Sequence, residues 1–247
     1  MTDFFDKLQV GPQLVSDCSG CEGFWYALKE LFPHNSRLIS SCDCAVAPLK
    51  FNLSNLEPLK LFQNVAGRDL FDVAQLSNTY AAGFPCQPFS VLHNDSELLG
   101  DPRAKVLFWV LAAIATTGPA LALLENVVGI LRVWKKVWKA LKKLEKYEYL
   151  VAKILIDPLL LGDASKRRRV YIIIVHRSVL RPEIATHAKL EKVLNETLGR
   201  MELPGQAPPD PSHLMFPDDH PEVQRNAQER MKRAKASGKE IWDLVSK

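Results

Sequence analysis

The sequence predicts an α/β protein with a doubly wound, mainly parallel sheet and a short C-terminal helical appendage. Three observations carry this prediction. Short strand-like runs alternate with segments whose apolar residues recur at helical spacing. The chain has 247 residues, of which 47% are hydrophobic, and this is enough for one large buried core. Strands joined through helices form right-handed βαβ units, which make their sheet mainly parallel.

The first part of the chain supplies two pairs of a strand and a helix. Residues 14–18 are a strand, and a glycine-bearing turn leads from it into a helix over residues 24–32. Residues 37–42 are the next strand, and residues 45–52 are the helix after it. A short segment at 71–75 ends at the polar SNTY, and AAGF then leads into a loop that contains a cysteine between two prolines.

The second part supplies the rest of the predicted sheet. Residues 106–116 are an apolar helix that stops before a Gly-Pro pair, and ALALLENV at 120–127 is a buried strand with a polar tip. Residues 132–147 are a basic amphipathic helix, and residues 149–156 and 169–175 are two further strands. Ligands of such sheets bind at the carboxyl ends of the strands, so we expect the functional residues directly after them.

The composition changes after the last predicted strand. Prolines and polar residues dominate residues 181–221, and LPGQAPPDP at 203–211 is typical of a linker. Residues 222–247 are expected to form a basic helix or helix pair. The sequence therefore predicts a larger domain over residues 1–178, followed over residues 179–247 by a proline-rich linker and a basic helical segment.

Charge is distributed unevenly along the chain. The formal net charge is +4, and basic residues concentrate at 132–146, 165–169 and 224–239. This pattern suits a polyanionic partner, although a solvated helix face explains the first and third runs equally well. The longest apolar stretch, 106–128, is interrupted by polar residues, and the N-terminus lacks a signal-peptide pattern. We expect an intracellular protein without membrane contact, nuclear in a eukaryote and cytoplasmic in a prokaryote.

The five cysteines are Cys18, Cys21, Cys42, Cys44 and Cys86. An odd number without a secretion signal indicates free thiols in a reducing compartment. The spacings Cys-x-x-Cys and Cys-x-Cys also occur in zinc sites. These cysteines lie at strand ends rather than in two knuckle-like turns, so we expect no metal.

Three segments at the strand ends, GFPCQPFS (83–90), ENV (125–127) and SKRRRVYIIIV (165–175), resemble in order and spacing the DNA (cytosine-5) methyltransferase family. Weaker similarities are SDCSGCEGF (16–24), GRDLFDV (67–73) and DPRAKVLFWV (101–110). The resemblance covers roughly residues 14–177. It implies a Rossmann-like class I methyltransferase that uses S-adenosylmethionine and acts on double-stranded DNA.

The resemblance also implies a chemical role for each strong motif. Carbon 5 of cytosine is too weak a nucleophile to accept a methyl group until a thiolate adds to carbon 6, and Cys86 is the implied thiolate. Glu125, kept protonated by a dry pocket, would hydrogen-bond N3 and the exocyclic amine of the base. Arg169, and secondarily Arg167, would hold O2 and orient Glu125. The implied substrate-binding residues are Gln87, Ser90, Asn126 and Arg167, of which Asn126 braces neighbouring loops.

The implied cofactor site lies after the first strands and comprises Asp17, Cys18, Gly20, Gly23, Phe24, Asp43, Asp69 and Pro85. Gly20 and Gly23 would admit the methionine part of the cofactor at a helix N-terminus. Phe24 would pack against the adenine or in the core. Asp69 would accept from the adenine amine, and Asp43 is the nearest acid for the ribose hydroxyls.

Several positions depart from the family pattern. Glu22 stands where the family has a second glycine, and its side chain would crowd the cofactor or turn outward. The acid at the end of the second strand is displaced, and Ser165 replaces a glutamine. The family's Gly-Asn-Ser turn is not found between 177 and 247, and these residues are too few for a typical recognition domain. Recognition is therefore minimal or supplied by a protein partner.

Three functions remain open at this point, in the following order. The first is an active cytosine-5 methyltransferase acting on DNA. The second is a catalytically impaired, methyltransferase-like DNA-binding or regulatory subunit, which the altered cofactor loop favours and the retained Cys86, Glu125 and Arg169 oppose. The third is a tRNA cytosine-5 methyltransferase, whose branch usually has a threonine shortly after the cysteine in place of QPFS.

Overall fold

The computed structural model describes residues 11–89, 102–163, 165 and 167–203, together with residues 220, 221, 224, 225, 228, 229 and 232. Within them the strands form one seven-stranded sheet in the order β3-β2-β1-β4-β5-β7-β6. The strands are β1 (Gln13–Asp17), β2 (Arg37–Cys42), β3 (Lys60–Phe62), β4 (Thr79–Ala82), β5 (Leu121–Val127), β6 (Tyr149–Ile156) and β7 (Arg169–His176). Strands β1 to β5 pair in parallel, and β7 runs antiparallel to both of its neighbours. The predicted doubly wound, mainly parallel sheet is confirmed.

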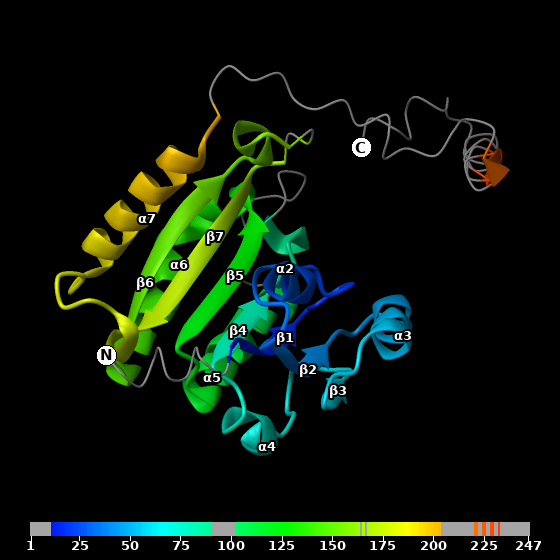
Figure 1. Cartoon of the computed structure of the whole chain (residues 1–247), viewed down its shortest axis with the longest axis horizontal. Coiled ribbons are helices and arrows are strands. Elements are labelled where there is room, and N and C mark those ends of the chain that lie inside the picture. The colour runs from blue at the N-terminus through cyan, green and yellow to red at the C-terminus, as the bar shows by residue number, and fades with distance from the viewer. Residues whose placement is uncertain are drawn as a thin grey trace.

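Helices cover both faces of the sheet (Figure 1). One face packs against α4 (Phe71–Ala74), α5 (Val106–Thr117) and α6 (Trp134–Leu141) and forms the largest core cluster. The other face packs against α2 (Gly23–Leu31) and α7 (His187–Met201), and α3 (Val46–Asn55) follows β2. Alternation along β1 explains the two layers, because Val15 belongs to the first core and Leu14 to the second.

Short 3-10 helices connect these elements. They are η1 (Gln87–Phe89), η2 (Pro102–Lys105), η3 (Val128–Val133), η4 (Lys142–Tyr147), η5 (Pro158–Leu161) and η6 (Arg177–Val179). The single helix expected over residues 132–147 is therefore wrong in detail, since only α6 is α-helical and η3 and η4 continue it at either end. Among the described residues, no helix has the length and apolar character to cross a lipid bilayer.

Strand β4 is absent from the sequence prediction, which treats SNTY as a polar break. In the structure Tyr80 is fully buried within β4, and its hydroxyl donates a hydrogen bond to the carboxylate of Asp17 on β1. Thr79 donates to Asn78, whose side-chain oxygen also accepts from the backbone of Gln13. Tyr80 and Asn78 thus have partners on β1, and Thr79 has one in the adjacent Asn78, which is why the local pattern misses the strand.

Helix α7 corrects the expectation of a linker from residue 181 onward. Thr186 caps the helix by accepting from the backbone of Lys189 at 3.3 Å, and Leu190 packs on β6 together with Leu194. The cap and the spacing of these leucines were readable signals that the prolines on either side obscured. The segment 203–211 lies almost entirely outside the described residues, as does most of 222–247, so the division of the chain at residue 178 stays a prediction.

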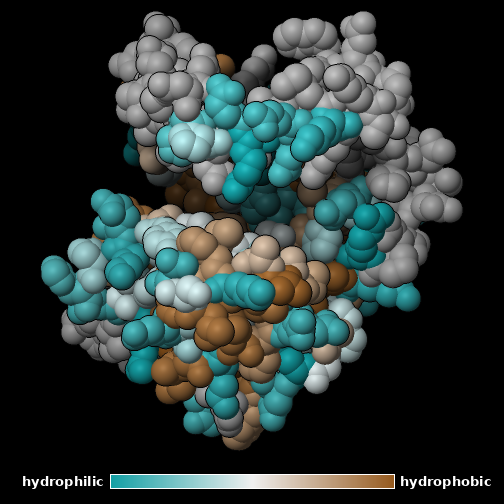
Figure 2. Space-filling model, turned by 90° about the vertical axis from the view of Figure 1, so that its right-hand side faces the viewer, coloured by the Kyte–Doolittle hydropathy of each residue, from teal (hydrophilic) through white to brown (hydrophobic). Residues whose placement is uncertain are grey.

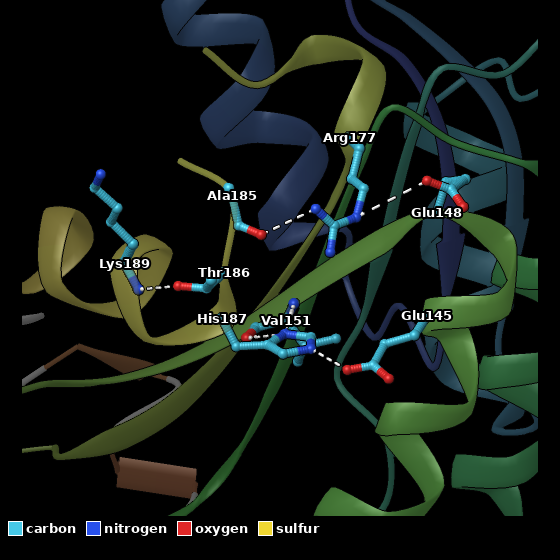
Figure 3. Close-up of polar contacts among 8 residues, drawn as sticks. All are labelled: Glu145, Glu148, Val151, Arg177, Ala185, Thr186, His187 and Lys189. Carbon is cyan, nitrogen blue, oxygen red and sulfur yellow. Dashed lines mark hydrogen bonds and ion pairs between the residues drawn. The ribbon is translucent and has the colours of Figure 1, made fainter. Parts of the chain in front are cut away.

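His187 fastens the first turn of α7 to the sheet (Figure 3). Its Nδ1 accepts from the backbone of Val151 at 2.9 Å, so its Nε2 carries the proton and donates to Glu145 on η4. The ring also meets Trp138 edge-on, with centroids 5.1 Å apart.

We expect His187→Ala to lower the free energy of unfolding by about 2 kcal/mol, because it removes a hydrogen bond to a backbone amide and the contact with an aromatic ring. Urea unfolding followed by circular dichroism measures this change. The matched control is Lys189→Ala on the same helix, whose exposed side chain should contribute less than about 0.5 kcal/mol. Equal losses in the two variants would contradict the anchoring role of His187.

Candidate functional site

A cleft of about 520 Å³ lies at the carboxyl ends of the parallel strands. The predicted residues that line it are Cys18, Gly20, Asp43, Pro85, Cys86, Gln87, Glu125, Arg167 and Arg169. Figure 2 views the molecule from the α3 side and shows it hollowed across the middle, with hydrophobic residues gathered below the hollow. Exposed apolar side chains of this region include Val46 and Leu53 on α3 and Leu61 on β3. Residues separated by up to 151 positions in the sequence thus meet in one cleft, from Cys18 to Arg169.

The loop after β4 carries Cys86, which is half-buried in the cleft wall. The Cys86 carbonyl accepts from the backbone of Phe89 at 2.9 Å and so closes η1. Phe84 and Phe89 are buried on either side of the thiol and meet edge-on at 6.1 Å. Asn126, also buried, donates from its amide to the Phe84 carbonyl at 3.0 Å and braces the loop from β5. Ser90, a predicted substrate-binding residue, lies outside the described residues.

Gly129 is a site residue that the sequence did not single out. A Cβ atom on this residue would lie 1.8 Å from the carbonyl oxygen of Phe89, so only glycine lets η3 approach the cysteine loop this closely. Arg132 strengthens the contact by donating to the same oxygen at 3.3 Å. The readable signal was a glycine directly after ENV.

We expect Gly129→Ala to push the cysteine loop away from η3, since the new methyl group must displace the backbone. If the chain catalyses the methyl transfer that the resemblance implies, its rate should fall about tenfold, and the midpoint of thermal unfolding should fall by several degrees. Initial rates and calorimetry test this, with Gly199→Ala on the exposed part of α7 as control, because a Cβ there meets nothing within 4 Å. Unchanged rates in Gly129→Ala would contradict the tight approach.

Glu125 and Arg169 form an ion pair across β5 and β7, with Nε and Oε1 2.7 Å apart. The side chain of Glu125 is 24% exposed in the open cleft, so the dry pocket expected around it is not present in this arrangement. Arg167 is exposed at the cleft rim, and Arg168 points toward Asp157 at 4.0 Å. The thiol, the acid and the guanidinium therefore face the same cleft.

The loop after β1 is tied to β2 by Asp43. One carboxylate oxygen of Asp43 accepts from the backbone of Gly20 at 2.9 Å, and the other from Ala45 at 2.8 Å. Gly20 adopts a left-handed φ of 52°, and a Cβ atom there would meet nothing within 4 Å. Asn64, which the sequence did not indicate, lines the cleft beside Asp43.

Four predicted cofactor residues lie elsewhere. Asp17 is fully buried below the cleft, where both terminal nitrogens of Arg68 and the hydroxyl of Tyr80 donate to its carboxylate. Phe24 packs in the core cluster beneath α2, and Gly23 begins that helix outside the cleft lining. Asp69 lines a second cavity, of about 500 Å³, beside α4 and α5, and accepts from the backbone of Phe71 at 2.8 Å.

Glu22 turns neither toward the cleft nor outward, so both expectations for its side chain are wrong. It is 0% exposed, and neither carboxylate oxygen has a hydrogen-bond partner among the described residues. Burial raises the pKa of Glu22 to about 7, although the facing hydroxyls of Ser41, Ser16 and Ser19 oppose this shift. Its backbone, at the N-cap of α2, has a left-handed φ of 60°. The loop between β1 and α2, which contains Gly20, therefore has the side chain of Glu22 buried beneath it.

The other four cysteines are Cys18, Cys21, Cys42 and Cys44. Within the part of the chain that the structure describes, no group of three or more Cys, His, Asp or Glu side chains is placed to hold a metal ion. Burial raises the pKa of Cys42 to about 12, and nearby Asp17 adds to that shift, so this thiol stays protonated. Burial also raises the pKa of Cys18. Neither thiol has the environment of a reactive thiolate.

Comparison with known proteins gives the family. The model of the C-5 cytosine-specific DNA methylase family matches residues 18–245. The type II methyltransferase M.BanI of Aneurinibacillus aneurinilyticus is 35% identical over 97 residues, which are 37% of this chain and 22% of that protein.

Similar solved structures include a mutant of Spodoptera frugiperda DNMT2, with a TM-score of 0.56 and 19% identity over 70% of this chain and 52% of that one. Another is a putative DNA modification methyltransferase encoded within an Escherichia coli prophage, with a TM-score of 0.56 and 16% identity; the match covers 71% of this chain and 51% of that one. The chain thus spans about half the length of these structures, which share its fold. Since the family model covers most of the sequence, the chain belongs to the C-5 cytosine-specific DNA methylase family.

Proposed function

We propose that this protein transfers a methyl group from S-adenosylmethionine to carbon 5 of a cytosine in double-stranded DNA. One observation carries the proposal: Cys86, Glu125 and Arg169 line a single cleft that also reaches the glycine loop after β1. These three side chains supply a nucleophile, an acid and a rigid cation on one side of the cleft, and the turn after β1 leaves its backbone open on the other side. This arrangement suits a reaction between two bound molecules.

The residues of the cleft fit the cofactor. Its volume lies in the range of small-molecule sites, and Gly20 leaves the backbone of the loop open. Asp43 uses one hydrogen bond at each carboxylate oxygen, so lone pairs remain for ribose hydroxyls. Cys18 and Pro85 complete this end of the cleft, and Glu22, being turned inside, does not obstruct it. When bound, S-adenosylmethionine would supply an electrophilic methyl group.

The side chains of the cleft would activate the base. The target cytosine leaves the duplex and enters the cleft, because its ring atoms are inaccessible in the stack. The Cys86 thiolate forms a bond to carbon 6, and the displaced electron pair is shared between carbon 5 and the N3 edge, where Glu125 hydrogen-bonds the ring. Arg169 holds Glu125 in place and faces O2. After methylation, a water molecule takes the proton from carbon 5, and the electron pair of that bond re-forms the double bond to carbon 6 and expels the thiolate.

One labelling experiment tests the proposal against its two alternatives, a catalytically impaired binding subunit and a methyltransferase that acts on RNA. The protein is incubated with tritiated S-adenosylmethionine and duplex DNA, tRNA, or DNA containing 5-fluorocytosine, which traps the adduct. Label on DNA and a covalent complex with the fluorinated duplex are expected. Label on tRNA alone would transfer the function to RNA, and cofactor binding without label or adduct would indicate a binding subunit. Target recognition would come from residues 179–247 or from a protein partner.

We expect Glu125→Gln to lower the rate of methyl transfer about 100-fold, because the amide keeps the shape of the side chain but cannot exchange a proton with N3. Cofactor affinity, measured by calorimetry, should stay within about twofold. Asp157→Asn serves as control, since this carboxylate lies near Arg168 outside the cleft lining. A rate within threefold of the unmodified protein would refute the role of Glu125.

A further inference from the structure

Six lysines form one continuous surface on α6 and η4, which we name the lysine face: Lys135, Lys136, Lys139, Lys142, Lys143 and Lys146. All six are exposed. On α6, where a turn takes about 3.6 residues, Lys135, Lys136 and Lys139 lie within roughly a third of the helix circumference, and η4 carries the other three lysines. The opposite side, with Val137, Leu141 and Leu144, is buried in the main core, so the lysine face is held at a defined place on the protein.

The lysine face carries little counter-charge of its own. Lys135 and Lys139 form an i,i+4 pair within α6, where like charges destabilise a helix. The acid within the run, Glu145, is engaged by His187. The pKa of Glu145 is lowered first by its hydrogen bond with His187 and also by the charge of Lys142. Among the described residues, none of the six lysines forms an ion pair with a carboxylate. Lys135 and Lys136 also occupy the first turn of α6, where the helix dipole disfavours cations. Such repulsion is relieved by a polyanion.

The lysine face begins beside the cysteine loop. The preceding helix, η3, touches that loop through Gly129 and Arg132, and Lys135 follows one turn later. From Lys135 to Lys146 the face extends for about 17 to 19 Å, at rises of about 1.5 Å per residue along α6 and about 2.0 Å along η4. One strand of B-DNA presents a phosphate about every 3.4 Å along its axis. The face is therefore as long as about five phosphates.

The aromatic residues of α6 distinguish a nucleic-acid surface from a membrane surface. A helix that lies in a membrane interface needs apolar side chains beside its lysines. Here Trp134 and Trp138 stack on each other at 6.2 Å, Lys153 covers the ring of Trp134, and His187 meets Trp138. Both tryptophan rings are engaged by contacts with the protein. Tyr147, which is exposed beside the lysines, has the ammonium group of Lys146 over its ring at 4.6 Å, so the exposed arc offers mainly charge.

We propose that the lysine face binds the phosphate backbone of duplex DNA next to the target base, outside the catalytic cleft. This inference rests on the proposed function, and it adds a surface and a direction for the substrate: away from the cysteine loop along α6 and η4. Lysine suits the task because it contacts phosphates as a point charge without reading the bases. The surface would therefore contribute affinity and not sequence preference.

The test compares two variants that lose the same charge. In the first, Lys135→Gln, Lys139→Gln and Lys142→Gln are combined. In the control, Lys189→Gln, Lys192→Gln and Arg200→Gln are combined on α7, which covers the opposite face of the sheet (Figure 1). Binding to a 30-base-pair duplex is measured by fluorescence anisotropy between 50 and 200 mM salt. The first variant should bind at least about tenfold more weakly at 50 mM salt, and its salt slope should be shallower by about 2.7.

The outcomes separate this inference from the proposed function. Equal salt slopes for the two variants would overturn the role of the lysine face. The same binding assay with duplex RNA and with vesicles containing phosphatidylserine would also overturn it if the first variant lost more affinity for either of these than for duplex DNA. A thermal midpoint of the first variant at or above that of the unmodified protein shows that lost binding is not lost folding. If the unmodified protein forms no adduct with fluorinated DNA, the catalytic proposal fails, whereas the difference between slopes still decides whether this surface binds DNA.

Discussion

Cys86→Ser is expected to lower methyl transfer by at least about 1000-fold, a loss of about 4 kcal/mol in transition-state stabilisation. A serine hydroxyl at this position is a far weaker nucleophile than a thiolate, so the ring would not be activated at carbon 6. The loop itself should persist, because the backbone contact from Cys86 to Phe89 and the bond from Asn126 to Phe84 do not involve the sulfur atom.

Three measurements on Cys86→Ser check this expectation. The initial rate of methyl transfer should not exceed that of a blank without enzyme. The covalent adduct with DNA containing 5-fluorocytosine should be absent on denaturing gels. The affinity for the cofactor, measured by calorimetry, should be unchanged. Cys21→Ser is the matched control, because Cys21 is exposed and does not line the cleft. Turnover or adduct formation by Cys86→Ser would remove the thiol from the mechanism.

Glu22→Gln is expected to make the protein more stable above pH 7, by up to about 3 kcal/mol. Burial raises the pKa of Glu22 from its ordinary value of 4.5 to about 7, so the folded state binds the proton more tightly than the unfolded state does. The stabilisation is fully present below about pH 4.5 and is lost as the pH rises through about 7. Above that pH the folded protein holds a buried carboxylate, and the facing hydroxyls of Ser41, Ser16 and Ser19 offset only part of the cost of its burial.

Urea unfolding between pH 4.5 and pH 9 tests the behaviour of Glu22. The two proteins should have similar free energies of unfolding at pH 4.5 and diverge as the pH rises. Asp17, whose pKa burial also raises, is present in both proteins, and its charge adds to the raised pKa of Glu22. Glu30→Gln, at an exposed position of α2, should run parallel to the unmodified protein. If the free energy of unfolding of Glu22→Gln also changed with pH in parallel with that of the unmodified protein, ionisation of Glu22 would not destabilise the folded state.

Local sequence patterns were sufficient for most of the sheet. Strands β1, β2, β5, β6 and β7 and helix α5 appear where the apolar runs and helical spacing predict them, within one or two residues. Periodicity works here because each of these elements buries one or both faces in a core, so its own residues carry the signal. Strand β3 and helix α7 were missed because one is three residues long at the sheet edge and the other lies between prolines.

The sequence by itself determined the α/β class and brought Cys86 and Glu125 forward, because residues after parallel strands must gather at one edge of a sheet. Arg169, which begins the antiparallel strand β7, was added by the resemblance to the family. Only the tertiary structure decided that Asp17 is held inside by Arg68 and Tyr80 and that Glu22 turns inward. These outcomes depend on partners far away in the chain: Tyr80 lies 63 residues from Asp17. A polar residue in a sequence does not say whether water or another side chain will satisfy it, and the choice is made by packing.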